Sequence, residues 1–506
     1  MIEQLLPLQL KPGFFNNGTT YQAKGRWFRG SLVRFFEGAL RPLGGWVTQT
    51  IGGVTMVGVA RALLSYMKYD GTYLTVVGTT GGLYAIVEDT TTRTAYDITP
   101  AGLTAAYASH TGGIASPDDR LTWSLSNFGD YAITSFQWEG QNELIAADMG
   151  GVTLVVWDGD PAHIAAPSPV AIAEHPYVVL ASFVTPEKFV VALGAEDPQT
   201  ILTAINPDAR MVWWASQATT DTWYPSALNS AGSFSLPSQG TLKAGMPFRG
   251  ASLIWTTRDL WSMSYIGQPL IYSFQQVGME CGIISSHAFV GTSNAAFWMG
   301  LNRFFRFDGF VSPIQCDVAD YVFGNMNAAY QHKIWALHNA EFNEVTWFYV
   351  STTATEIDSY VTYNYTENHW VFGVLSRTAG VTAQVPGRVP VLTDALGNFY
   401  DHETGTNKCG AATYCESGPV ELGEGDQVMR IQRIVPDDKT LGDVSLTLFT
   451  SLFPDQAEAS FGPYAAADPT NVRATGRQVR LRFDEVNAVA WRVGQTRLGV
   501  IPVGRR

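Results

Sequence analysis

Seven short aromatic cassettes, each beside a tight turn, recur along the middle of the chain and constrain its fold more than any other feature. Apolar runs that alternate at period two beside a Gly, Asn-Gly or Asp-Gly corner favour hairpins. One hairpin cannot bury its own face, whereas a ring of small sheets lets each sheet cover its neighbour and leaves few open edges. The cassettes occupy residues 82–86, 154–159, 211–214, 258–261, 303–309, 363–365 and 397–401.

These cassettes predict an all-β fold, a decorated β-propeller of six or seven blades over residues 51–405. Residues 1–50 are predicted to form an extended arm that docks on something else, followed by a hairpin at 25–46. An early strand there either closes the ring by pairing with the last blade or forms a simple edge hairpin. Period-two runs at 444–450 and 479–483 predict a small C-terminal β-sandwich or barrel over residues 406–506, after a linker or crossing segment at 404–426. Several β-sandwiches in series are the alternative fold.

The composition agrees with a β-rich protein. Only 15% of residues are charged and 12% are aromatic, and 49 Gly and 25 Pro punctuate short runs rich in Val, Thr, Trp, Tyr and Phe. The best helical candidate is short, at residues 317–326. The four cysteines are too few for a disulfide scaffold and are expected to be free thiols. The N-terminal sequence resembles no secretion signal and no stretch is apolar enough to span a membrane, so we expect synthesis in a cytoplasm.

Charge is distributed unevenly along the chain. Residues 1–50 hold six bases and two acids, and residues 471–506 hold eight arginines and two acids. Since the whole chain carries −13, the ends are +4 and +6 and residues 51–470 are −23. An acidic body repels nucleic acid at long range. The pattern fits ordinary solubility, and it also fits a conduit to whose wall DNA does not adhere.

Motifs of known catalytic and cofactor-binding sites are missing from the sequence. There is no phosphate-binding Gly-rich loop with Lys-Ser/Thr and no Gly-x-Ser-x-Gly elbow. The one grouping of metal-binding residue types is Asp401, His402 and Glu403 with Cys409 and Cys415, whose spacing fits no standard zinc pattern. We therefore predict that the protein is not an enzyme and assign no catalytic, cofactor-binding or metal-binding residue. No cofactor is expected.

Propeller glycosidases supply the main alternative function. They need two carboxylates about 5 to 10 Å apart in the central cleft, and sequence alone does not show whether any two of the 45 acids form such a pair. A virion-associated glycosidase or carbohydrate-binding, receptor-binding propeller is thus the alternative, and a cytoplasmic scaffold is a third. The arginines between 473 and 497 would bind phosphates or, as is more usual on an exposed sheet, pair with the acids of a protein partner.

Several stretches, taken together, resemble the tail nozzle or packaged-DNA stabilisation family of short-tailed bacteriophages. The resemblance spans nearly the whole chain, and its motifs are structural rather than catalytic. Its clearest pieces lie at residues 25–46, 210–223, 262–267, 297–300, 342–349, 363–365, 369–370, 416–419 and 434–436.

The resemblance implies a structural virion protein, a homohexamer around the tail axis below the portal and adaptor ring. Double-stranded DNA would be retained behind it and would pass down the centre during ejection, without sequence-specific binding. Tail needle or fibres would be further partners, and the protein would be located in the virion tail. Turns near 129–130 and 158–160 are candidates for a gate by location alone.

Overall fold

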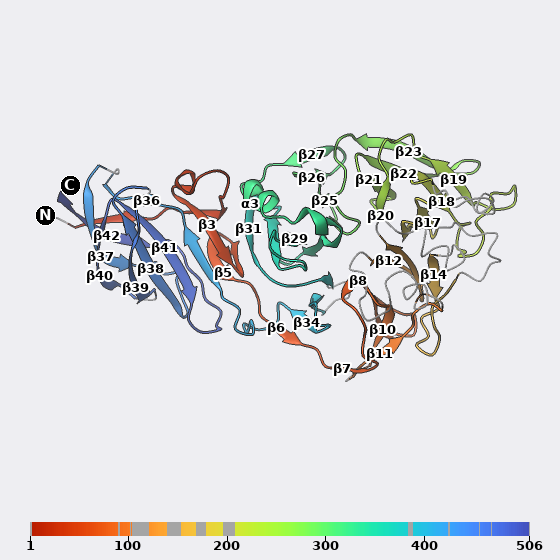
Figure 1. Ribbon diagram of the computed structural model, residues 1–506, viewed down its shortest axis with the longest axis horizontal. Coiled ribbons are helices and arrows are strands. Elements are labelled where there is room, and N and C mark those ends of the chain that lie inside the picture. Colours follow the sequence, from red (N-terminus) through yellow and green to blue (C-terminus); the bar gives the residue numbers. More distant parts are fainter. Residues whose placement is uncertain are drawn as a thin grey trace.

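The computed structural model describes residues 3–89, 92–101, 103, 121–138, 153–167, 179–195, 208–382, 388–423, 426–454, 456–466 and 468–504. Figure 1 shows a ring of small sheets with a second, elongated module to one side, and both chain ends lie at the far end of that module. Among the described residues, no helix is both long and apolar enough to cross a membrane.

The ring is a β-propeller, and within the described residues it has seven blades of antiparallel strands. The first three blades are β8 (Ala60–Met67), β9 (Tyr73–Thr79), β10 (Leu83–Glu88) and β11 (Arg93–Asp97); β12 (Leu121–Phe128), β13 (Tyr131–Trp138), β14 (Leu154–Trp157) and β15 (Ala166–Pro167); β16 (Ala181–Val184), β17 (Val190–Leu193), β18 (Met211–Trp214) and β19 (Gly232–Ser235).

The remaining blades follow in the same order along the chain. They are β20 (Leu242–Phe248), β21 (Ala251–Thr256), β22 (Leu260–Gly267) and β23 (Ile271–Gly278); β24 (Phe289–Gly291), β25 (Ala296–Met299), β26 (Phe304–Phe307) and β27 (Val311–Ile314); β28 (Trp335–Asn339), β29 (Glu344–Tyr349), β30 (Ser359–Asn364) and β31 (His369–Val374); and β32 (Ala379–Val381), β33 (Val391–Thr393) and β34 (Phe399–His402). The predicted fold class is confirmed.

Each of the seven aromatic cassettes lies on, or overlaps, the third strand of a different blade. In chain order these strands are β10, β14, β18, β22, β26, β30 and β34. The unequal spacing of the cassettes therefore reflects loops of different length between blades rather than missing blades. The seven blades lie within the predicted range of six or seven.

Buried tryptophans hold neighbouring blades together. The Trp123 indole N–H, on the second blade, donates to the Thr79 carbonyl on the first, at 2.8 Å. Trp347, on the sixth blade, donates to the Ala288 carbonyl at the entrance to the fifth, at 3.0 Å. Both rings are fully buried. Large aromatic rings fill the wedge between radiating sheets, and a backbone carbonyl satisfies the buried N–H of these two indoles.

The ring is closed by a strand from the N-terminal segment. β6 (Trp46–Thr48) pairs antiparallel with β34 and is the fourth strand of the last blade, and β7 (Ile51–Gly53) then pairs parallel with β11 of the first blade. Between these two blades, Arg93 lies 3.3 Å from Glu88 and 3.6 Å from Asp401. Of the two roles considered for an early strand, ring closure is confirmed, although the strand follows the hairpin rather than belonging to it.

The second module is a β-sandwich built from both ends of the chain. One sheet has the order β1 (Gln4–Pro7), β42 (Arg497–Gly504), β37 (Val428–Val435) and β40 (Thr470–Gly476). The other runs β2 (Lys11–Phe14), β3 (Arg26–Ser31), β35 (Tyr414–Ser417), β41 (Gln478–Glu485), β38 (Val444–Ser451) and β39 (Ala459–Ala465), with β36 (Val420–Glu421) also beside β41. We call the first of these the terminal sheet. Apolar side chains alternate inward along β38 and β41 and form the sandwich core.

Several local expectations need correction, while the boundaries predicted at residues 50 and 405 stay predictions. The N-terminal arm docks on its own chain, as β1 and β2 of the sandwich. The hairpin is shorter than predicted: β4 (Val33–Phe36) and β5 (Ala39–Pro42) meet at a turn where Glu37 and Gly38 have φ of 52° and 73°. The segment taken as a linker contains β35, a central strand of the sandwich. The expected short helix is present as α3 (Ala319–Gly324).

The closing strand offers a test of how far the ring depends on it. Trp46 is buried, is stacked on His402 with ring centroids 5.2 Å apart, and lies under the Arg377 guanidinium. Trp46→Ala is expected to lower the free energy of unfolding by about 3–5 kcal/mol, because it leaves a large cavity at the seam. Val47→Ala, on the same strand but 52% exposed, is the control and should change it by about 0.5 kcal/mol or less. Equal effects in urea denaturation would contradict this role of the seam.

Candidate functional site

The innermost strands of all seven blades surround a central channel. A cavity of about 200 Å³ is lined by residues of β8, β12, β16, β20, β24, β28 and β32 and of the segment entering β24. Its wall consists mainly of small side chains, which allow seven strands to converge. The lining includes Ser124, Ser126, Ser182, Gly245, Ser286, Ala336, Ala379 and Gly380.

Two of the side chains that line the channel are titratable, Arg61 and His287. Burial lowers the pKa of His287 to about 4, so this imidazole is neutral at physiological pH. The Arg61 guanidinium makes two hydrogen bonds with the Glu356 carboxylate, at 2.8 and 2.7 Å. Lys333 donates to the same carboxylate at 3.1 Å and to the Thr355 carbonyl at 2.7 Å. Arg61 is therefore held in an ion-pair network at the channel wall.

The central cleft of a propeller is where a glycosidase would hold its catalytic carboxylates. That reaction needs one carboxylic acid to protonate the leaving oxygen and a second carboxylate to act as base or nucleophile. None of the described residues that line the channel is Asp or Glu. The described wall thus presents hydroxyls, a neutral imidazole and a paired guanidinium.

The two turns named from the sequence as gate candidates lie together on one face of the propeller. The Tyr69 amide donates to the Asp130 carboxylate at 2.8 Å, and the Tyr66 hydroxyl donates to the Asp130 carbonyl at 3.2 Å. Gly159 lies against the same carbonyl, so closely that a Cβ there would be 2.4 Å from the oxygen. His163 pairs with Asp158 at 2.6 Å, and this hydrogen bond raises the pKa of His163. These contacts fix the turns of the first two blades relative to one another.

Beside these turns is an open groove of about 430 Å³ that is lined by residues of the first three blades. Two tyrosines at its edge are conspicuously accessible, Tyr69 at 84% and Tyr131 at 46% exposure. Asp130 and Lys188 also line it, so the groove combines aromatic faces with one acid and one base. The sequence signal for it is weak, since a Tyr beside a turn glycine occurs at many hairpins.

The residues considered as a metal site from the sequence do not form one cluster in the structure. The His402 imidazole accepts a hydrogen bond from Arg377 at 2.9 Å, and burial, with the neighbouring Arg377 charge, lowers its pKa to about 3. Asp401 accepts from Gln49, and Glu403 accepts from Arg34. Cys415 is buried in the sandwich while Cys409 is exposed. Within the described part of the chain, no group of three or more His, Cys, Asp or Glu could hold a metal ion.

A buried ion cluster joins the hairpin to the propeller. The guanidinium of Arg34, on β4, donates to Glu344 on β29 at 3.2 and 2.9 Å and to Glu403 after β34 at 3.1 Å. It also lies over the Phe342 ring, 3.6 Å from its centroid. Burial raises the pKa of Glu344, an effect that the Arg34 charge opposes. Because carboxylates from two blades bind one guanidinium, the cluster fixes the hairpin on the propeller.

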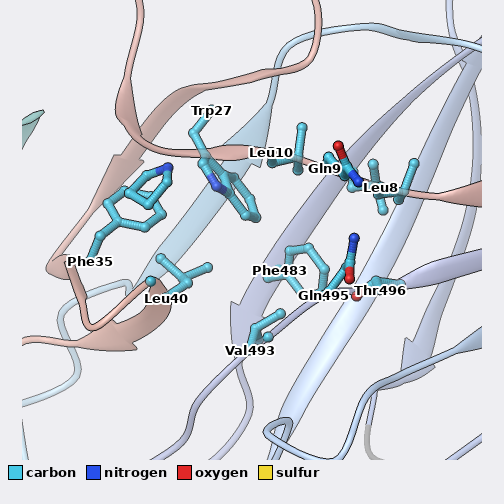
Figure 2. A pocket seen from close by; sticks show the side chains of 14 residues that line it. Leu8, Gln9, Leu10, Trp27, Phe35, Leu40, Phe483, Val493, Gln495 and Thr496 are labelled. Carbon is cyan, nitrogen blue, oxygen red and sulfur yellow. The ribbon is translucent and has the colours of Figure 1, made fainter.

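The cavity between the arm and the sandwich is shown in Figure 2. It has a volume of about 160 Å³, and Trp27, Phe35, Leu40 and Phe483 dominate its wall. The Leu8 amide donates to the Thr496 carbonyl at 2.9 Å along the same seam. No acid or base is among its lining residues in the described chain, so we assign it to the packing of the arm on the sandwich.

Comparison with known proteins finds remote similarities to solved structures. No family model matches the chain, and no curated protein matches it. A solved exo-β-1,3-galactanase from Phanerochaete chrysosporium is 10% identical with a TM-score of 0.30, over 90% of this chain and 100% of that one. YCF48 from Cyanidioschyzon merolae has 8% identity and a TM-score of 0.37, over 71% and 98% of the two chains. The coronin WD40 domain of Toxoplasma gondii has 8% identity and a TM-score of 0.37, over 74% and 87%. At these scores the similarities carry no argument about function.

The network at the channel wall predicts a specific acid sensitivity. Burial alone would raise the pKa of Glu356, but hydrogen bonds and charges from Arg61 and Lys333 lower it to about 2. The pKa of Glu356 is therefore lower in the folded chain than in the unfolded chain, where it is about 4.5. The ionised carboxylate stabilises the fold above pH 4.5, and this stabilisation is lost as the pH falls toward 2. The wild-type protein should lose on the order of 3 kcal/mol more between pH 5 and 2 than Glu356→Gln. Parallel stability curves for the two proteins would contradict the network.

Proposed function

We propose that the chain is a structural subunit of a short bacteriophage tail. Several copies, six by the resemblance, would form a nozzle below the portal and adaptor ring that retains packaged DNA and conducts it during ejection. The observation that carries the proposal, beside the sequence resemblance, is the separation of charge between two fused modules. Residues 46–403 hold 14 Lys and Arg against 31 Asp and Glu, a net charge of −17, while the rest of the chain is +4.

This separation suits a conduit subunit. A strongly acidic propeller repels DNA phosphates, so a duplex could move past it without adhering. The channel of a single propeller, at about 200 Å³, has room for a small cluster of waters and not for a duplex. The DNA path would therefore lie between copies of the chain, along the tail axis.

The proposed role is mechanical and needs neither a cofactor nor catalysis. The propeller supplies a rigid body, because each blade is packed on both sides and the ring is closed. The sandwich holds the two chain ends together and is joined to the propeller through the closing strand and Arg34. Such a subunit transmits contacts from the ring above to the tail tip without changing its own fold.

The location of the chain in particles tests the proposal. Immunogold electron microscopy of intact particles, with antibody to this chain, should place the label at one vertex, on the tail. Tailless capsids from the same preparation are the control and should carry no label. Label that is missing from tailed particles, or that is spread over the capsid, would overturn the proposal.

A carbohydrate-binding role on the virion is the second candidate, and the groove with Tyr69 and Tyr131 favours it. Accessible tyrosine rings offer apolar faces for sugar rings while Asp130 and Lys188 offer hydrogen bonds. If this role holds, Tyr69→Ala with Tyr131→Ala should weaken binding of the purified protein to host cells at least about tenfold. Tyr96→Ala, which removes a 36% exposed tyrosine elsewhere on the first blade, is the control. Unchanged binding in the double variant would remove this candidate.

A further inference from the structure

The outer face of the terminal sheet is basic. Its four strands carry four arginines, Arg430 and Arg433 on β37, Arg473 on β40 and Arg497 on β42, and no Asp or Glu. Side chains along β40 alternate between the two faces of the sheet. Val472 and Ala474 are buried in the sandwich core, and Arg473, between them, is exposed. The arginines therefore share the face that points away from the other sheet.

The arginines of the two sheets differ in their partners. On the second sheet, Glu416 accepts from both Arg29 and Arg482, and Arg480 pairs with Glu458. On the terminal sheet, Arg433 lies 3.1 Å from Glu3. For Arg430, Arg473 and Arg497, no ion pair forms with any carboxylate of the described chain. Arg480 and Arg482 of the second sheet are thus neutralised within the chain, whereas these three arginines of the terminal sheet are not. The contact of the arginines between 473 and 497 with phosphates or with a partner's acids stays a prediction.

The chain's own propeller cannot neutralise this face. Figure 1 shows the terminal sheet at the end of the sandwich remote from the propeller, with the second sheet between them. In another copy of the chain, however, the segment that contains the propeller, residues 46–403, carries a net charge of −17.

We propose that the outer face of the terminal sheet docks on the acidic propeller of a second copy of this chain. Guanidinium groups suit this contact because they bind carboxylates through two hydrogen bonds at fixed geometry. Two different surfaces meet, so the contact is heterologous, and repetition generates a ring where the rotation closes. This inference rests on the proposed function: in an assembled tail, the contact would join neighbouring subunits.

Sedimentation of the full-length chain tests the contact. In 50 mM salt the wild-type protein should self-associate with increasing concentration, and 500 mM salt should reverse this, because exposed charges are screened. Arg430→Glu with Arg473→Glu should weaken the association at least about tenfold. Lys11→Glu with Lys439→Glu makes the same charge change at two exposed sandwich sites off this face and is the control. A wild-type monomer at every concentration, or equal association of both double variants, would overturn the proposal.

A cross-linking experiment identifies the occupant. Arg473→Lys keeps the charge and adds an amine that a carbodiimide can couple to a carboxylate in contact with it. In a mixture of ¹⁵N-labelled and unlabelled Arg473→Lys protein, links between copies should join position 473 to propeller acids. Links within one copy alone, or saturable binding of a DNA duplex that the double glutamate variant abolishes, would show that the face serves another purpose. Self-association without presence in tails would refute the proposed function alone, whereas tails that assemble normally from the double variant would refute this contact alone.

Discussion

The whole architecture depends on one strand that closes the propeller from the other end of the chain. β6 follows directly from the hairpin whose Arg34 is bound by two propeller carboxylates, and the strands before that hairpin belong to the sandwich. The path of the chain is therefore sandwich, seam, seven blades and sandwich again. Neither module can form completely without residues from the N-terminal segment, which crosses both. A closed ring with its last blade completed in this way has few free edges, and this protects many short strands from pairing with other chains.

Charge divides along the same line as the two modules. The propeller concentrates acids, and most of the sandwich's internal arginines are neutralised around Glu416, Glu458 and Asp484. What remains is a basic outer face at one end of an otherwise acidic molecule. Opposite charge on two parts of the same chain gives association a preferred direction and disfavours propeller-to-propeller contact, where like charges would meet. This division of charge supports the proposed role of the chain as a subunit of an ordered assembly.

The sequence predicted the blades well because their third strands must be aromatic. Trp157, Trp214 and Trp261 mark blades that differ widely in loop length, and the period-two runs around Leu446 and Leu481 predicted the sandwich. The closing strand was harder to predict from the sequence, because Trp46–Thr48 is only three residues long and its partner lies some 350 residues later. The same holds for the groove at Tyr69 and the basic sheet face, because spatial neighbours from different strands leave no local pattern. Asp401, His402 and Glu403 illustrate the converse. Asp401 and His402 alternate across β34, Glu403 follows the strand, and the three side chains bind different partners.

The most direct test of the account is a cryo-electron microscopy reconstruction of intact tailed particles, refined around the tail axis. The account predicts copies of a seven-bladed ring with its sandwich around an axial channel, with the terminal sheet of each copy on the propeller of the next. Density for this chain elsewhere in the particle, or propellers arranged around the axis with the basic sheet face exposed to solvent, would contradict it.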